Sequence, residues 1–529
     1  MQKIQKNLWK IIINTISIIL IIVGIASFFI TAYFNTDIES ANEKTLYKMD
    51  NIFLNIILIL VFLFLIYKLS KIENKIVRNT LIILGFIGSI IIQVLWVLKI
   101  KFIPESDQGY VIYCARALKD RGMLEFISSP GNYLNLYPFQ IGFAKYLQLI
   151  IRVMNSDKAV YMQLFNVIYS VINLILMYKI TKKLFKEEKI RRISLILILG
   201  FSIYFMFFNI HVYGNIIGLM FSLLALYTML NYLENKKLYK IFLIALFITI
   251  SIVLKSNYNI FLCGIIFTMF FEFLNNKKIR DLISIVIILI LYITGKNTFY
   301  KYMEKAIDMK LSEGVPMISY IYMGMAEPTG LSSGWYTEDT LRIYSECNFD
   351  NKEAAKKSKE LIKTRLTFMK QNPKYTIGFL GDKIASTWLN PTFQTVWCSK
   401  PGIRLQWYPE YNEYFQKQTL IKSMLGGKIY NLEEQYFNAY QIIIFIFAGY
   451  GILKLNKRNE AKYILLPIIF LGGFVFHIFW ETKAIYVLQY YFLLIPYTAL
   501  GLKEFYNRLK GLAFNNSGKF RNLKFLKKI

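Results

Sequence analysis

The chain has 529 residues, of which 55% are hydrophobic and 17% aromatic, and its formal net charge is +30 at pH 7. Apolar runs of about 20 residues recur along it, and this is the helix length that crosses the roughly 30 Å hydrocarbon core of a bilayer. Spanning β-barrels are excluded because their strands alternate and are only about ten residues long. Nucleic-acid binding is excluded because the basic residues lie in short loops rather than in a stripe interleaved with aromatics. The sequence therefore predicts an all-α polytopic membrane protein.

Twelve membrane-spanning helices are predicted from the apolar runs. The first run follows Lys3, Lys6 and Lys10 and is too long for a signal peptide, so we expect an uncleaved helix. The predicted spans lie near residues 11–30, 52–69, 79–100, 161–180, 193–212, 215–233, 239–254, 258–274, 281–298, 437–454, 463–479 and 486–502.

Lys and Arg gather in alternate loops, as in "YKLSKIENKIVR", "YKITKKLFKEEKIRR", "NKKLYK", "NNKKIR" and "KLNKRNEAK", and in the C-terminal "GKFRNLKFLKKI". Because cytoplasmic loops carry the excess of positive charge, both termini are expected in the cytoplasm. The predicted division is a two-helix N-terminal extension (1–78), a transmembrane core (79–298), a large outer segment (299–436), a three-helix membrane segment (437–502) and a basic cytoplasmic tail (503–529).

Two long segments are expected outside the membrane. The first, 101–160, contains "IGFAKYLQLIIRV", which is too short and too charged to span and is typical of an interfacial helix. The second contains "NKEAAKKSKELIKTRLTFMKQNP", which predicts a surface helix ended by Pro373. It also contains four of the seven Trp residues of the chain, so it is either a simple cap or a platform for a ligand.

The stretch "KFIPESDQGYVIYCARALKDRG" places Glu105 and Asp107 just beyond the third predicted span. One interpretation is that Ser106 or Asp107 caps the following helix, because such residues favour helix starts. The other is a functional acid at the outer boundary of the membrane. Ionisable groups held at that boundary tend to mark substrate paths.

Further ionisable residues lie at outer helix ends. Both histidines of the chain, His211 and His477, lie there, as do Lys255 in "LKSNYN" and Glu481 and Lys483 in "FWETKAIY". Each alone could contact lipid headgroups. Together they indicate a site for an anionic, lipid-linked substrate.

At these residues the chain resembles the GT-C glycosyltransferases, and most closely the bacterial relatives of the protein O-mannosyltransferases. The resemblance covers about residues 79–502. It is carried by "PESDQGYVIYCARAL", "LNLYPFQIGFAKYL", "HVYGNIIGLMFSLLALY", "MGMAEPTGLSSGWYTED" and "WETKAIYVLQYYFLLIP". Where the family pattern leads us to expect a basic residue before the Tyr of the last string, this chain has Ile485.

The resemblance implies transfer of a sugar, with inversion, from a polyprenyl-phosphate donor to an extracytoplasmic glycan, lipid or protein. It implies Asp107 as general base, with Glu105 as the second choice. The expected donor-phosphate residues are Lys255, Lys483, His211 and Arg116, and the expected acceptor or sugar contacts are Tyr137, Trp335, Tyr336 and Trp397. No cofactor is predicted with certainty. The need for a divalent metal is left open, because an adjacent pair of acids would favour metal binding and this chain has a single Asp at that position.

Two other functions compete with this hypothesis. A polysaccharide polymerase of the O-antigen or capsule type would also have many spans and a large outer loop, but its chemistry depends on outer-loop arginines, and few are present here. A transporter or flippase would have broken helices and polar groups near the middle of the membrane. The predicted spans are mostly unbroken runs of Ile, Leu and Phe, which favours the glycosyltransferase.

Overall fold

The computed structural model describes residues 2–34, 37–39, 43–328 and 330–525. In this part of the chain nine helices are long and apolar enough to cross a membrane. They are α1 (Gln2–Phe29), α2 (Ile52–Ser70), α3 (Lys75–Ile100), α8 (Ala159–Leu184), α9 (Glu188–Phe208), α10 (Asn215–Asn235), α12 (Asn259–Asn276), α13 (Ile279–Ile307) and α21 (Lys428–Leu453). Two apolar helices are shorter, α11 (Tyr239–Leu254) and α22 (Leu465–Phe479). The predicted helical membrane protein is therefore confirmed in outline.

Each predicted span except the last coincides with one helix. The last, 486–502, is instead divided among a 3-10 turn η6 (Ala484–Tyr486), α23 (Leu488–Phe492) and the start of α24 (Ile495–Phe525). Pro496 lies in the first turn of α24, where its missing N–H is tolerated, so a new helix begins there. In the described part of the chain, the residues predicted to form the basic cytoplasmic tail therefore continue α24.

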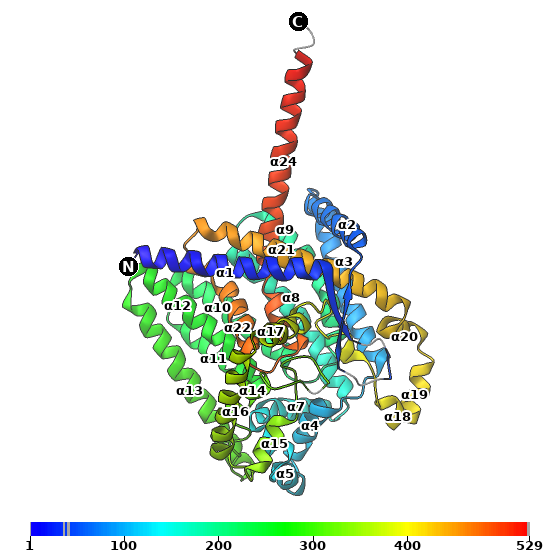
Figure 1. The fold of residues 1–529 in the computed structure, drawn as a ribbon, viewed down its shortest axis with the longest axis vertical. Coiled ribbons are helices and arrows are strands. Elements are labelled where there is room, and N and C mark those ends of the chain that lie inside the picture. The colour runs from blue at the N-terminus through cyan, green and yellow to red at the C-terminus, as the bar shows by residue number, and fades with distance from the viewer. Residues whose placement is uncertain (1, 35–36, 40–42, 329, 526–529) are drawn as a thin grey trace.

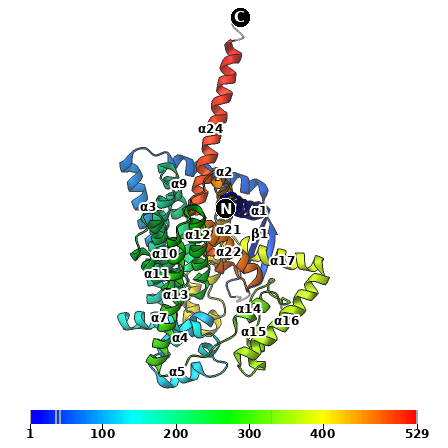
Figure 2. The ribbon, with the colours of Figure 1, turned by 90° about the vertical axis from the view of Figure 1, so that its left-hand side faces the viewer.

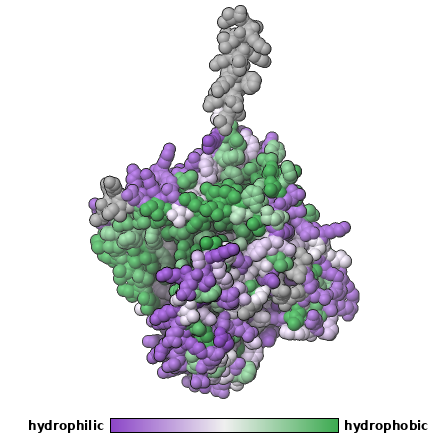
Figure 3. Space-filling model, viewed as in Figure 1, coloured by the Kyte–Doolittle hydropathy of each residue, from purple (hydrophilic) through white to green (hydrophobic). Residues whose placement is uncertain are grey.

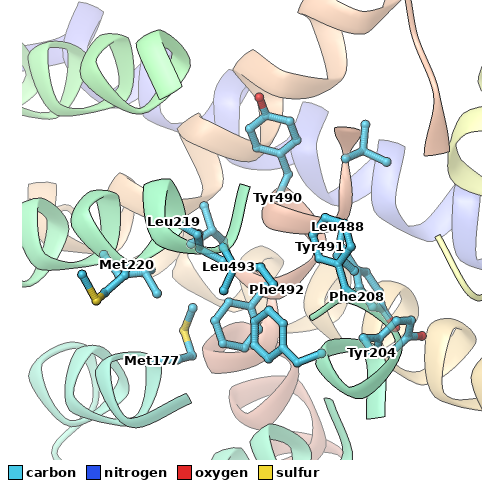
Figure 4. Close-up of a cluster of buried hydrophobic side chains, with 14 of the residues drawn as sticks. Met177, Tyr204, Phe208, Leu219, Met220, Leu488, Tyr490, Tyr491, Phe492 and Leu493 are labelled. Carbon is cyan, nitrogen blue, oxygen red and sulfur yellow. The ribbon is translucent and has the colours of Figure 1, made fainter. Parts of the chain in front are cut away.

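Helix α23 owes its apolar composition to the protein core rather than to lipid. The ring of Phe492 lies 4.5 Å, centre to centre, from that of Phe201 on α9. Figure 4 shows Leu488, Tyr491 and Phe492 among side chains from α8, α9 and α10. A window of hydropathy cannot distinguish such a buried segment from a lipid-facing one.

Two glycines bring α21 and α24 into close backbone contact. A Cβ on Gly451 would lie 2.1 Å from the Tyr497 carbonyl oxygen, and one on Gly501 would lie 2.0 Å from that of Phe447. Small residues at such crossings are typical of membrane helices, because association there depends on close packing.

The basic helix ends lie together at one end of the molecule. Lys183 pairs with Glu234 at 2.7 Å, Lys503 pairs with Glu187 at 2.8 Å, and Arg192 donates to the Ile72 carbonyl. These contacts join the ends of α2, α8, α9 and α10 around the base of α24, which projects at the top of Figures 1 and 2.

Short helices form the opposite end of the molecule, which is the hydrophilic lower part of Figure 3, below the hydrophobic surface over α1, α12 and α13. Both segments for which the sequence predicts non-spanning helices are helical. One is α7, and the other is α16, followed directly by α17 with Pro373 at its start. The 101–160 segment contains α4 (Ser106–Ala117), α5 (Arg121–Ser128), α6 (Tyr133–Leu136), η1 (Pro138–Gln140) and α7 (Ile141–Met154). The 299–436 segment contains α14 (Met317–Met323), α15 (Asp339–Glu346), α16 (Asn351–Gln371), α17 (Pro373–Trp388), η3 (Trp397–Ser399), α18 (Arg404–Trp407), α19 (Pro409–Gln416) and α20 (Thr419–Gly426). Further 3-10 turns are η2 (Ser256–Tyr258), η4 (Lys454–Lys457) and η5 (Ala461–Tyr463).

The N-terminal extension contains a β-hairpin that the sequence pattern does not predict. Strands β1 (Ile30–Phe34) and β2 (Thr45–Met49) pair antiparallel, with Ile30 opposite Met49 and Phe34 opposite Thr45. The Ala32 N–H donates to the Leu389 carbonyl at 3.1 Å, so the hairpin is joined to the end of α17. The first two helices lie outside the resemblance, yet they position this hairpin beside the large outer segment.

Candidate active site

A cavity of about 1310 Å³ lies among the helix ends opposite the cluster of basic helix ends (Figure 1). Its walls come from the turn between α3 and α4, the turn after α11, the segment after α22 and the large outer segment. Seven of the ten site residues expected from sequence line it: Glu105, Asp107, Tyr137, Lys255, Tyr336, Trp397 and Lys483. Residues from distant parts of the chain thus meet in one place.

Asp107 lies in the first turn of α4, and its carboxylate is exposed to the cavity. Within the described residues it has no hydrogen bond or ion pair, although Lys255 and Lys483 are close enough for its charge to raise their pKa values. The N-cap of α4 is Glu105, which makes no capping hydrogen bond with its side chain. Neither Ser106 nor Asp107 caps the helix, so capping does not explain Asp107.

The backbone fixes Asp107 at the cavity. Ser106 has a φ of 51°, which is unusual for a residue other than glycine. The buried Gln108 accepts a hydrogen bond from the backbone N–H of Val212 at 2.8 Å. This contact holds the start of α4 against the α9–α10 turn, next to Tyr213.

Glu105 is engaged elsewhere. It pairs with Arg404 at 3.5 Å, and both side chains are largely buried. Burial raises the pKa of Glu105, and Arg404 opposes the rise. Arg404 also donates to the Ile103 carbonyl. We therefore assign Glu105 to holding α18 against the α3–α4 turn, and Asp107 remains the better candidate base.

Lys255 is buried in the turn after α11, with only 8% of the residue exposed. Its ammonium lies 3.6 Å from the centre of the Tyr213 ring, a cation–π contact. Burial lowers its pKa to about 8, and the charges of Asp107 and Glu481 limit the fall. In the described part of the chain it has no carboxylate within ion-pair distance.

Lys483 differs from Lys255 because it is ion-paired with Glu43, from the connection between β1 and β2. Burial lowers its pKa, but Glu43, Glu481 and Asp107 together raise it above the ordinary value. Nearby, Glu481 is buried and accepts a hydrogen bond from the Tyr486 hydroxyl at 3.2 Å. Burial raises the pKa of Glu481 to about 7, against the effect of Lys483.

Aromatic side chains cover much of the cavity wall. The rings of Tyr110 and Tyr133 are stacked with their centres 5.0 Å apart, and those of Tyr320 and Trp480 are stacked with their centres 5.5 Å apart. Tyr336 is half-buried, and burial together with the charge of Asp107 raises its pKa to about 12. Such rings offer apolar faces with polar rims, which suits a sugar.

Three expected site residues do not line the cavity. Arg116 pairs with Asp157 at 2.9 Å, and the Trp335 indole is buried and donates to the Ser386 hydroxyl. Burial, Lys255 and Lys483 lower the pKa of His211 to about 3, so its imidazole is neutral at pH 7 and cannot act as a cation.

Conversely, Glu43 and Arg404 line the cavity but are not expected there from sequence. Glu481, which is among the ionisable residues that indicate a site, also lines the cavity, although the sequence predicts no specific role for it. Glu43 and Arg404 carry no local signal, since only the tertiary fold brings them there. Among the described residues, no three His, Cys, Asp or Glu side chains form a group suited to a metal ion.

Residues 142–301 match a family model described as dolichyl-phosphate-mannose-protein mannosyltransferase. This segment includes Lys255, whereas Asp107 and Lys483 lie outside it. The match confirms the resemblance to the GT-C glycosyltransferases. No curated protein matches the chain significantly.

Two solved structures from Archaeoglobus fulgidus are similar to the chain. One is an oligosaccharyltransferase tethered with an acceptor peptide containing the NVT sequon, with 12% identity and a TM-score of 0.40 over 80% of this chain and 50% of that one. The other is the oligosaccharyltransferase AglB in complex with an inhibitory peptide and a dolichol-phosphate, with 12% identity and a TM-score of 0.41 over 82% and 52%. The chain spans about half the length of these structures.

Proposed function

We propose that this membrane glycosyltransferase moves a sugar from a polyprenyl-phosphate donor to a hydroxyl group of an acceptor on the outer side of the membrane. The observation that carries the proposal is the exposed carboxylate of Asp107 in a cavity of about 1310 Å³ that Lys255 also lines. One group can remove a proton and the other can bind a phosphate. The acceptor is a glycan, lipid or protein of the cell envelope.

The reaction needs one base and one anion site. Asp107 takes the proton of the acceptor hydroxyl as its oxygen attacks the anomeric carbon. The bond from that carbon to the phosphate oxygen breaks, and the electron pair leaves with the polyprenyl phosphate. Lys255 stabilises the charge that grows on this leaving group. A single displacement of this kind inverts the anomeric centre and needs no covalent enzyme intermediate.

The orientation that fits this reaction places the cavity outside the cell and both termini in the cytoplasm. It is supported by the cluster of basic helix ends at the end of the molecule remote from α4, α5 and α15 (Figure 1). The polyprenyl tail would lie between membrane helices below the cavity.

The reaction is tested in membranes containing the full chain and radiolabelled polyprenyl-phosphate hexoses. We expect release of polyprenyl phosphate that depends on an added acceptor and is lost in Asp107→Asn. The absence of any sugar transfer from such donors by the wild-type protein would contradict the proposal.

The orientation is tested separately by cysteine labelling, in a variant lacking the four native cysteines. A membrane-impermeant reagent added to intact cells should label Lys119→Cys and spare Lys186→Cys. Labelling of position 186 from outside would reverse the proposed topology.

A further inference from the structure

A second cleft, of about 580 Å³, lies beside the catalytic cavity. The two spaces share Phe139 and Met317 as lining residues, so they are adjacent. The volume of the second cleft falls within the roughly 300–1,000 Å³ of small-molecule sites. None of the residues to which the proposed reaction assigns a role lines it.

One wall of the cleft is the outer part of α13. Lys296, Tyr300 and Glu304 line it, and their spacing of four places them on one face of the helix. With 29 residues, α13 is about 43 Å long, whereas the hydrocarbon core is about 30 Å thick. The last turns of α13 therefore extend beyond the membrane and present this face at the boundary with water.

The opposite wall of the cleft is the connection between α13 and α14, which packs against the segment before α7. The Val315 N–H donates to the Leu136 carbonyl at 3.0 Å, and the Ser312 hydroxyl donates to that of Asn135. Gly314 has a φ of +71°, and a Cβ there would lie 2.5 Å from the Pro138 ring. The connection between α13 and α14 is thereby fixed against the chain that carries Tyr137 and Phe139, and the cleft is preformed.

The lining indicates a ligand that is polar but not strongly charged. Two cations, Lys296 and Lys359, are balanced by Glu304 and Glu313, and Tyr300 and Phe139 add aromatic surface. A phosphate would favour uncompensated cations, as at Lys255. Sugar units combine hydroxyl groups, which hydrogen-bond amines and carboxylates, with apolar faces that stack on rings.

We propose that this cleft binds the sugar units of an oligosaccharide acceptor that lie behind its reacting end. The reacting hydroxyl enters the catalytic cavity, and the chain passes Phe139 and Met317 into the cleft. This rests on the proposed function and narrows its acceptor to a glycan. A polypeptide acceptor is the alternative that the test must distinguish.

The test compares Tyr300→Ala with Tyr302→Ala in the full-length protein held in lipid nanodiscs. Tyr302 is on the same helix, is 57% exposed and does not line the cleft. Calorimetric titrations use single hexoses and linear gluco-, manno- and galacto-oligosaccharides as probes. We expect affinity to rise with chain length and Tyr300→Ala to weaken oligosaccharide binding roughly three- to tenfold. Binding of single hexoses, and all binding by Tyr302→Ala, should be unchanged.

Three results would overturn this inference. Affinity could be independent of oligosaccharide length, or Tyr300→Ala and Tyr302→Ala could weaken binding equally. Unglycosylated peptides could also bind more tightly than oligosaccharides and lose that binding in Tyr300→Ala. Lipid-phosphate release with a single-sugar acceptor should be normal in Tyr300→Ala, because the catalytic cavity is intact. If the wild-type protein transfers no sugar but still shows length-dependent binding that requires Tyr300, the cleft is a saccharide site and only the proposed reaction fails.

Discussion

The charges in two parts of the catalytic cavity differ in whether they have partners. At the start of α4 and in the turn after α11, Asp107 and Lys255 have no ion pair within the described residues. In the segment after α22, Lys483 is paired with Glu43 and Glu481 accepts a hydrogen bond from Tyr486. A buried ammonium without a carboxylate is unfavourable unless an anionic ligand compensates it. We therefore propose that Asp107 and Lys255 act on the substrate, whereas Lys483 and Glu481 support the cavity.

The largest expected effect is that of Asp107→Asn. The amide keeps the size of the side chain but cannot accept a proton, so transfer should fall by roughly 10²-fold or more. The measurement is the initial rate of lipid-phosphate release at saturating donor. Asp120→Asn is the matched control, because the Asp120 carboxylate caps α5 through the Met123 N–H and Asn caps about as well.

Stability separates this role from a structural one. Asp107 makes no capping bond, so both Asp107→Asn and Asp107→Ala should unfold at nearly the wild-type temperature. Near-normal turnover in the Asn variant would remove Asp107 from the mechanism and bring Glu105 forward in its place.

The second largest expected effect is the loss of donor binding in Lys255→Ala. The loss of a charge-assisted contact to phosphate should raise the donor KM by about tenfold or more. Lys483→Gln should raise it less, since Lys483 already has a carboxylate partner. Donor titrations of both variants measure this, and equal effects would abolish the distinction between paired and unpaired cations.

The pH dependence of donor binding tests whether the charge of Lys255 binds the donor. The pKa of Lys255 is lowered to about 8, so its charge is present below that pH and is lost above it. The phosphodiester of the donor keeps its charge throughout, and donor affinity should therefore fall as pH rises from 7 to 9. Lys255→Arg stays charged across this range, and a pH effect that persists in it would belong to another group.

Hydropathy predicted the helical membrane architecture in outline, and seven of the ten site residues expected from sequence line one cavity. Asp107, Lys255 and Lys483 could be found because ionisable residues at outer helix ends depart from the surrounding apolar pattern. Tyr336 followed from the resemblance, and Trp397 from the four Trp residues of the large outer segment. The prediction failed at α23, where apolar residues are buried in the protein core. Trp335 does not line the cavity, because its ring is buried and bonded to Ser386.

The N-terminal hairpin shows what local patterns cannot supply. Its strands are short, and Glu43 reaches Lys483 only because the Ala32 backbone N–H bonds to Leu389 and the Asn390 amide donates to the Ala32 carbonyl. No spacing in the sequence links these positions. The same holds for Arg404, which meets Glu105 only through the fold.

Glu43→Gln is the smallest expected effect and the most direct test of the paired region. The ion pair is only partly buried, with side-chain exposures of 17% for Lys483 and 21% for Glu43, so its loss should change binding by less than about fivefold. If the paired region only supports the cavity, donor affinity and turnover should both stay within about twofold of the wild-type values. A rise in donor affinity of roughly two- to threefold would mean that Glu43 competes with the donor phosphate for Lys483. Glu39→Gln is the matched control, because Glu39 is an exposed acid in the same connection and does not line the cavity. A fall in donor affinity in Glu43→Gln, with Glu39→Gln unchanged, would instead mean that Glu43 holds Lys483 in position for the donor, and the paired region would then take part in substrate binding after all.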